Sequence, residues 1–140
     1  MENTKRASFS IERYYFDQVH IDMDNHEGDK LFIDFQPSGI FDEKEKKYSL
    51  SFIFSAFSSD EEGAKPFVMI KCVGVFHFKE VDSLEDIPDF FYRNSIAILF
   101  PYLRAYVSMV TNQANIGPIM LPTLNLTSLE KPLKERSTTK

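Results

Sequence analysis

The sequence predicts an α+β fold, in which a four-stranded antiparallel sheet carries C-terminal helices packed on one face. Up to Lys79, apolar and polar residues alternate through three segments, and a fourth segment is rich in Val, Ile and Phe, as in strands of a sheet. From Ser83 onward, apolar residues recur every three or four positions, as in an amphipathic helix. The length of 140 residues fits one domain. We therefore expect a single domain over residues 1–140, with an ordered core at 8–129 and flexible tails at 1–7 and 132–140.

The first strand is predicted over residues 8–23. Its apolar residues share one parity: Phe9, Ile11, Tyr15, Val19, Ile21 and Met23. Tyr14 and Phe16 fall on the polar parity, whereas Arg13 and Asp17 interrupt the apolar one. A bulge or bend near residues 14–16 would reconcile the two patterns.

Three further strands are predicted. The second carries Leu31, Ile33 and Phe35 in alternation and is expected to end at Pro37-Ser38-Gly39. The third alternates from Tyr48 to Ala56, and the fourth, from Phe67 to Lys79, is rich in Val, Ile and Phe. The loops between them are short and polar, which favours antiparallel hairpins. The first connection is the expected exception, because the first strand is about twice as long as the second.

The main helix follows a start signal at Ser83-Leu84-Glu85-Asp86 and a short helix or turn over 87–94. One apolar stripe contains Ile96, Leu99, Phe100, Leu103, Tyr106, Val107 and Val110, and a second contains Ile98, Tyr102, Ala105 and Met109. A helix that is apolar on two sides packs between layers or against another subunit. A small sheet covers one side only, so the second side predicts a subunit interface. Pro101 should kink the helix or lie early in it.

An apolar loop, Ile116 to Pro122, follows the helix, although loops are usually polar. Asn125 is a suitable N-cap for a short last helix that carries Leu126 and Leu129. Pro132 and the polar tail are expected to end that helix.

Composition limits the classes of function. The net charge of −5 argues against nucleic-acid binding, which needs a basic face. Cys72 is the only cysteine, so no intrachain disulfide forms and a reducing compartment, the cytoplasm, is expected. The longest fully apolar run, Ile96 to Phe100, is far shorter than the roughly 20 residues of a membrane span. The 14 Phe and 6 Tyr residues fit either an aromatic core or an exposed apolar binding surface.

No arrangement of residues indicates catalysis, a metal or a cofactor. His20, His26 and His77 have no partner at metal-ligand spacing except carboxylates in loops or on strands. Cys72 lies within an apolar strand, which is typical of a buried and inert thiol. We therefore expect a protein that is not an enzyme.

Four stretches together resemble the SecB family of protein-export chaperones. Leu99-Phe100-Pro101-Tyr102-Leu103-Arg104 is similar to the Leu-Phe-Pro-Tyr-x-Arg core that opens the family's main helix. Leu121-Pro122-Thr123-Leu124-Asn125-Leu126 resembles the family's loop into its last helix. The weaker matches, Phe9-x-Ile11-x-Arg13-x-Tyr15 and Gly74-Val75-Phe76, fall in the right order, so the resemblance covers residues 9–129.

The resemblance implies an ATP-independent holdase that keeps unfolded polypeptides or preproteins extended in apolar grooves for export. It implies a homotetramer, a dimer of dimers, with the main helix buried between dimers. By position, the interface would use Ile98, Tyr102, Ala105, Tyr106 and Met109. The client-binding residues would be Leu31, Ile33, Phe35, Leu121, Leu124, Leu126 and Leu129.

The resemblance also implies acidic contacts to the translocation motor SecA. Asp22 matches one such position, whereas Gln18 and Met69 stand at two others. The family's last helix is longer, and its tail is acidic rather than basic. The alternative is a SecB-like module dedicated to a single partner, such as a chaperone of a toxin–antitoxin pair, without SecA docking.

Overall fold

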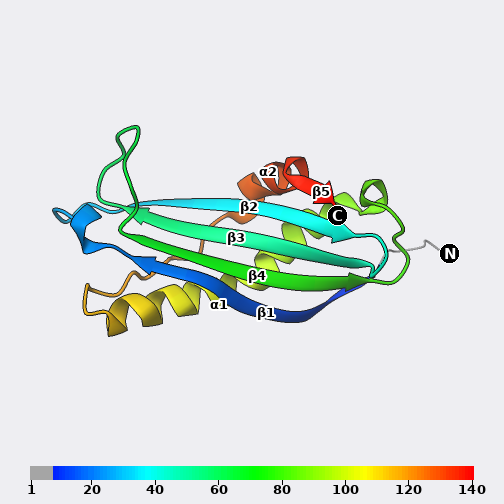
Figure 1. The fold of residues 1–140 in the computed structure, drawn as a ribbon, viewed down its shortest axis with the longest axis horizontal. Helices are drawn as coiled ribbons and strands as arrows, with labels where there is room; N and C mark the ends of the chain where they lie inside the picture. Colours follow the sequence, from blue (N-terminus) through cyan, green and yellow to red (C-terminus); the bar gives the residue numbers. More distant parts are fainter. Residues whose placement is uncertain (1–7) are drawn as a thin grey trace.

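Five strands form one sheet, and a long helix crosses one of its faces (Figure 1). The computed structural model describes residues 8–140. The strand order is β1-β4-β3-β2-β5, and only β5 runs parallel to its neighbour. The predicted α+β class with a sheet and C-terminal helices is confirmed, but the prediction of four antiparallel strands is wrong. The strands are β1 Phe9–Ile21, β2 Phe32–Asp42, β3 Lys47–Phe57, β4 Val68–Phe78 and β5 Ser137–Thr139.

One short helix lies between β1 and β2, and the other helices lie between β4 and β5. Single turns of 3-10 helix form η1 (Met23–Asn25), η2 (Leu84–Asp86) and η3 (Leu126–Leu129). The long helix, α1, spans Asp89–Gln113, and η3 leads directly into α2, Glu130–Glu135.

The central strands pair as the sequence predicts. β2 with β3 and β3 with β4 form antiparallel neighbours joined by short loops. The first connection is the exception, because β1 pairs with β4 and lies at the edge of the sheet. We call the side of the sheet that α1 covers the helix face and the opposite side the outer face.

Two register shifts in β1 change which of its side chains face the helix, compared with the alternation predicted from the sequence. They lie between Ile11 and Arg13 and between Phe16 and Gln18. Each shift inserts one extra residue and reverses the side on which the following residues point. Tyr14 and Phe16 therefore reach the helix face, where their rings stack on α1. Tyr15, predicted on the apolar side, lies beneath Arg13 on the outer face.

An aromatic core fills the space between the sheet and α1. Phe91, in the first turns of α1, is fully buried, and its ring centroid lies 4.8 Å from those of Phe9, Tyr48 and Phe78. Edge-to-face pairs of this kind add stability beyond the area they bury. Most of the phenylalanines are thus core residues, whereas Tyr14 and Tyr102 keep about two-fifths of their surface exposed.

Pro101 lies in the middle of α1 rather than early in the main helix. The predicted short helix over 87–94 is not separate, because α1 is continuous from Asp89. A proline lacks the N–H that would bond the carbonyl of Ala97. Pro101 and Ala97 both lie on the exposed side of α1.

The C-terminal residues 132–140, predicted as a flexible tail, form most of α2 and all of β5. Pro132 does not end the helix, because it lies in the first turn of α2, where a backbone N–H has no intrahelical partner. Leu133 is fully buried and anchors the segment. The other predicted tail, residues 1–7, lies outside the described residues.

The C-terminal segment is also held by a hydroxyl pair in which Tyr48 is buried and Ser137 is partly buried. The Tyr48 hydroxyl is hydrogen-bonded to Ser137 Oγ, which donates to the Leu133 carbonyl at 2.7 Å. A side chain at Gly39 would collide with the Tyr48 ring, so this position needs glycine. The buried tyrosine thus links β3 to the end of the chain.

We expect Ser137→Ala to lower the free energy of unfolding by about 1–2 kcal/mol, because it leaves the buried Tyr48 hydroxyl without its partner. Tyr48→Phe combined with Ser137→Ala should cost less than the sum of the single changes, since both partners are then removed. Urea unfolding of the four proteins measures this coupling. Strictly additive costs would contradict the link.

Candidate binding surfaces

Apolar side chains of the first half of β2 lie at the margin of the helix face. Ile33 and Phe35 pair with Ala56 and Phe54 of β3, whose side chains are buried on that face. Phe35 is half-buried, with its ring centroid 6.0 Å from that of Phe100. Ile33 is 38% exposed and Leu31, just before the strand, is 48% exposed. These three predicted client-binding residues therefore form one apolar strip, which we call the β2 strip.

The predicted residues of the terminal loop and helix differ in exposure. Leu121 is buried, and Leu124, Leu126 and Leu129 are partly buried against the core. The loop is attached to α1 through Thr111, whose Oγ1 accepts a hydrogen bond from the Ile119 N–H at 2.8 Å. Leu121 therefore serves first to hold the loop, and the partly buried leucines leave edges of their side chains accessible.

A groove between α1 and this loop was not predicted from the sequence. It has a volume of about 470 Å³ and is lined by Pro101, Arg104, Ala105, Ser108, Met120 and Leu121. Met120 is 71% exposed, between the buried Ile119 and Leu121. The unusual apolar composition of the loop was the available signal, but composition does not show which of its residues point outward.

The five predicted interface residues follow the outward side of α1. Tyr102 stacks on Tyr14 with 4.0 Å between ring centroids, and Tyr106 stacks on Phe16 at 3.8 Å. These two rings thus pack against β1 of the same chain. Ile98 is partly buried, Ala105 is exposed, and Met109 is 52% exposed.

The outward side of α1 continues onto β1 as one apolar surface. Val19 and Ile21 lie on the helix face of β1, beyond the two ring stacks, and each is 39% exposed. We call this surface the β1–α1 patch. It comprises Tyr14, Val19, Ile21, Tyr102, Ala105 and Met109.

The outer face of the sheet carries ion pairs. Lys71 on β4 lies 3.1 Å from Asp17, and Lys47 on β3 lies 3.3 Å from Glu12. Asp22, the residue that the resemblance assigns to SecA, accepts a hydrogen bond from the Asp24 N–H at 3.0 Å and caps η1. Two acids of β1 are thus neutralised by lysines of the same sheet, and Asp22 has a local structural role.

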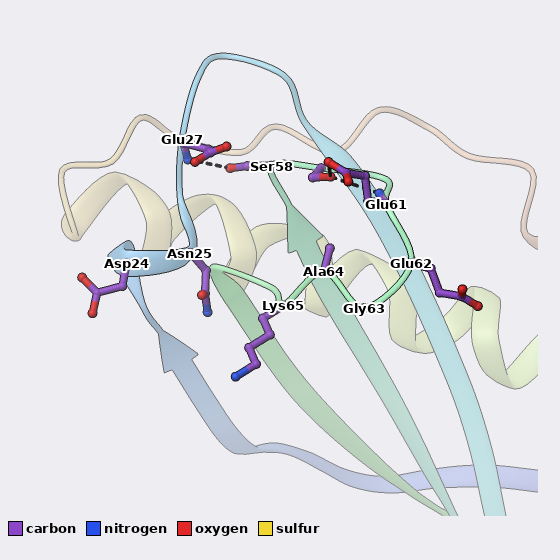
Figure 2. Close-up of a pocket in the computed structure, with 10 residues that line it drawn as sticks. Asp24, Asn25, Glu27, Ser58, Glu61, Glu62, Gly63, Ala64 and Lys65 are labelled. Carbon is purple, nitrogen blue, oxygen red and sulfur yellow. Dashed lines mark hydrogen bonds between the residues drawn. The ribbon is translucent and has the colours of Figure 1, made fainter.

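A polar pocket of about 370 Å³ lies between the loops at one end of the sheet (Figure 2). Its acids include Asp24, Glu27, Glu61 and Glu62, and the labelled carboxylates point in different directions. The Glu27 N–H donates to Ser58 Oγ at 3.0 Å. Within residues 8–140, no group of three or more His, Cys, Asp or Glu side chains is arranged to hold a metal ion.

Cys72 is the one nucleophilic thiol, and it lies in the core. Its side chain is fully buried, and burial raises the pKa of the thiol to about 12. Burial likewise raises the pKa of the Tyr92 hydroxyl to about 12, with a smaller contribution from Asp89. Both groups stay protonated and unreactive near neutral pH.

A sheet with one covering helix and exposed apolar margins places this chain among small α+β proteins that present apolar surface to a partner. The family model described as preprotein translocase subunit SecB matches residues 2–135. The chain therefore belongs to the SecB family, and the resemblance noted in the sequence is confirmed.

The individual proteins that match either cover less of the chain than the family model or share little of its sequence. An uncharacterized protein of Methanocaldococcus jannaschii is 40% identical over 65 residues, which span 45% of this chain and 42% of that protein. Among solved structures, the SecB-like chaperone Rv1957 of Mycobacterium tuberculosis, in complex with a ChAD peptide from the antitoxin HigA1, aligns with a TM-score of 0.66. The alignment covers 84% of this chain and 88% of that chain at 13% identity, and it shows a shared fold.

A protein of unknown function from Streptococcus agalactiae aligns with a TM-score of 0.46 at 17% identity, over 85% of this chain and all of that chain. A similarity at that level does not establish a shared fold.

In the part of the chain that the structure describes, no helix has the length and hydrophobicity needed to cross a membrane.

The raised pKa of Cys72 gives a direct test of the core. In the folded protein at pH 8, a water-soluble disulfide reagent should label less than a tenth of the thiol within an hour, whereas in 6 M guanidinium labelling should be complete. The thiolate is the reactive form, and burial suppresses both its formation and its access. Rapid labelling of the folded protein would contradict this placement.

Proposed function

We propose that this protein is an ATP-independent holdase that binds unfolded polypeptides or preproteins through exposed apolar surface. The β2 strip is the observation that carries the proposal, because Leu31 and Ile33 remain open to solvent beside an aromatic core. Membership of the SecB family supports it. So does the fold shared with a SecB-like chaperone whose structure contains a bound peptide.

The physical requirement for such binding is modest. A holdase needs many weak apolar contacts without a strict sequence requirement, and flexible or aromatic side chains provide them. The client site is proposed to join Leu31, Ile33 and Phe35 to the accessible edges of Leu124, Leu126 and Leu129. Leu121 supports this site by fixing the loop to α1. Nothing in such binding requires a catalytic group or a cofactor.

We propose that the β1–α1 patch is the surface through which dimers associate into a tetramer. An isolated chain would expose Tyr102, Met109 and the end of β1 together, and soluble proteins seldom leave contiguous apolar surface of this kind uncovered. The two ring stacks hold the patch rigid, which lowers the entropy lost on association.

A second candidate function is that of a chaperone for one partner. The structural neighbour binds a peptide from an antitoxin, which shows that this fold can serve a specific polypeptide. The pairing of Asp17 and Glu12 with lysines favours this candidate over export through SecA, because the family's SecA contacts rely on acids. Tight binding of one polypeptide, with indifference to generic unfolded chains, would identify it.

The holdase proposal is tested by light scattering of a refolding client without ATP. We expect the protein to suppress aggregation and Ile33→Ser to reduce that suppression at least threefold, because the change places a hydroxyl in the β2 strip. Ile40→Ser is the matched control. Ile40 lies on the same strand, is 49% exposed, and points to the outer face.

Ile40→Ser should suppress aggregation as the parent protein does. Equal losses in the two variants would argue against the β2 strip. No suppression by the parent protein would contradict the holdase proposal itself.

Sedimentation tests the proposed tetramer. The parent protein should have a mass of roughly four times 16.3 kDa. Met109→Glu should shift that mass toward the dimer, because a charge would be buried in the β1–α1 patch. Ala97→Glu, on a different side of α1, adds the same charge to an exposed position and should leave the tetramer intact. An unchanged mass in both variants would place the interface elsewhere.

A further inference from the structure

Met120 is held in an exposed position by its two neighbours in the loop that follows α1. Ile119 and Leu121 are 7% and 4% exposed, whereas Met120 between them is 71% exposed. The Ile119 N–H donates to the buried Thr111 Oγ1 at 2.8 Å, which ties the loop to α1. Because both neighbours are buried, the Met120 side chain is the one that this part of the loop presents at the groove beside α1.

Two hydrogen-bond donors of α1 line the groove with this methionine. Ser108 Oγ donates to the Met120 sulfur at 3.1 Å. Arg104, one turn earlier on the helix, lines the same groove, and among residues 8–140 it forms no ion pair. A thioether sulfur is a weak acceptor. A hydroxyl and a guanidinium in this position therefore suit an oxygen acceptor better than they suit sulfur.

We propose that Met120 is a reversible oxidation site, at which hydrogen peroxide converts the thioether to a sulfoxide that the donors of α1 hold. A lone pair of the sulfur attacks one peroxide oxygen, an S–O bond forms and the O–O bond breaks. The departing hydroxide takes the proton from the oxygen that has joined the sulfur and leaves as water. The sulfur is thereby oxidised by two electrons and the peroxide is reduced. The inference does not depend on the proposed function.

The two donors act at different stages of this reaction. Negative charge develops on the departing oxygen, and the Arg104 guanidinium lines the same groove and stabilises that charge. Once the sulfoxide has formed, its oxygen is the stronger acceptor, so the Ser108 hydroxyl bonds that oxygen in place of the sulfur. The groove then changes from apolar to polar at Met120, and reduction of the sulfoxide reverses the change.

The other exposed methionines lack this setting. Met23 is 44% exposed, but it lies between Asp22 and Asp24, whose carboxylates oppose the build-up of negative charge. Met109 is 52% exposed, but it belongs to the β1–α1 patch, which the proposed tetramer covers. Met23 therefore serves as the internal reference, an exposed methionine between acids.

The test treats the full chain with hydrogen peroxide and follows each sulfoxide by peptide mass spectrometry. We expect Met120 to be oxidised at least five times faster than Met23, whereas their exposed fractions differ less than twofold. Arg104→Gln should bring the two rates to within twofold of each other. Arg93→Gln is the matched control, because it removes the same charge from the first turns of α1, outside the groove, and should preserve the fivefold ratio.

Hydrogen exchange tests how the product is held. Oxidation should slow exchange of the Ile119 amide at least threefold, because a sulfoxide bonded to Ser108 ties the loop more firmly to α1. The slowing should be absent in Ser108→Ala, which lacks the donor. It should also be absent in Met120→Leu, which has no sulfur to oxidise at this position.

Equal oxidation rates at Met120 and Met23 in the parent protein would overturn the proposal, whether or not Arg104→Gln folds. Equal losses of rate in Arg104→Gln and Arg93→Gln would assign the effect to net charge and overturn the role of the groove. Unchanged exchange of the Ile119 amide after oxidation, or the same slowing in Ser108→Ala, would show that the sulfoxide is not held there and would overturn the proposal too.

Discussion

The width of the sheet relative to its one long helix determines where this protein exposes apolar surface, because α2 adds cover only over part of β2. The four long strands at about 4.8 Å spacing span about 14 Å, whereas a helix with its side chains is about 10 Å across. α1 crosses the middle of the helix face, and Phe91 and Leu99 bury their side chains completely there. The two flanks cannot be covered by the same helix. The β2 strip lies on one flank and the β1–α1 patch on the other.

The margin at β1 depends on keeping apolar residues on one side of a long edge strand. β1 is thirteen residues long and runs alongside β4. Two bulges change which of its side chains point to the helix face, so that Tyr14 and Phe16 face α1. Without the shifts, Arg13 and Asp17 would point at the helix and their charges would be buried without partners, at a high cost in free energy. With them, Asp17 meets Lys71 on the outer face. The bulges therefore account for both the ring stacks and the ion pair.

The sequence contained the fold class and the central hairpins, because β3 alternates without interruption, the first half of β2 alternates, and β4 is rich in Val, Ile and Phe. It did not show that β2 continues past Pro37-Ser38-Gly39 to Asp42, because proline and glycine usually end a strand unless its edge position tolerates them. It could not show β5, since Ser-Thr-Thr has no hydrophobic pattern and pairs only because Leu133 and Tyr48 hold the segment in place. Pro132 was misread for a related reason. Proline ends a helix or starts one according to its position, and position is fixed by tertiary contacts.

Candidate binding residues were identified by type, but their exposure depended on packing. Leu121 and Met120 are neighbours of similar hydrophobicity, yet one is buried and the other is the most exposed large apolar side chain described. The hydrogen bond from Ile119 to Thr111 fixes which of them points inward. A loop without a repeating pattern gives no such information in its sequence.

The charges of the outer face affect which partners can bind that face, and they lie apart from the two apolar flanks. Exposed ion pairs such as Lys71 with Asp17 contribute little to stability, since water screens them. Their effect is on the potential at the surface, because each pair removes a negative charge that a basic partner could meet. The apolar flanks lie on the helix face, away from these pairs. Polypeptide binding and any contact through the outer face are therefore physically separate, and a chain of this fold can lose the second while it retains the first.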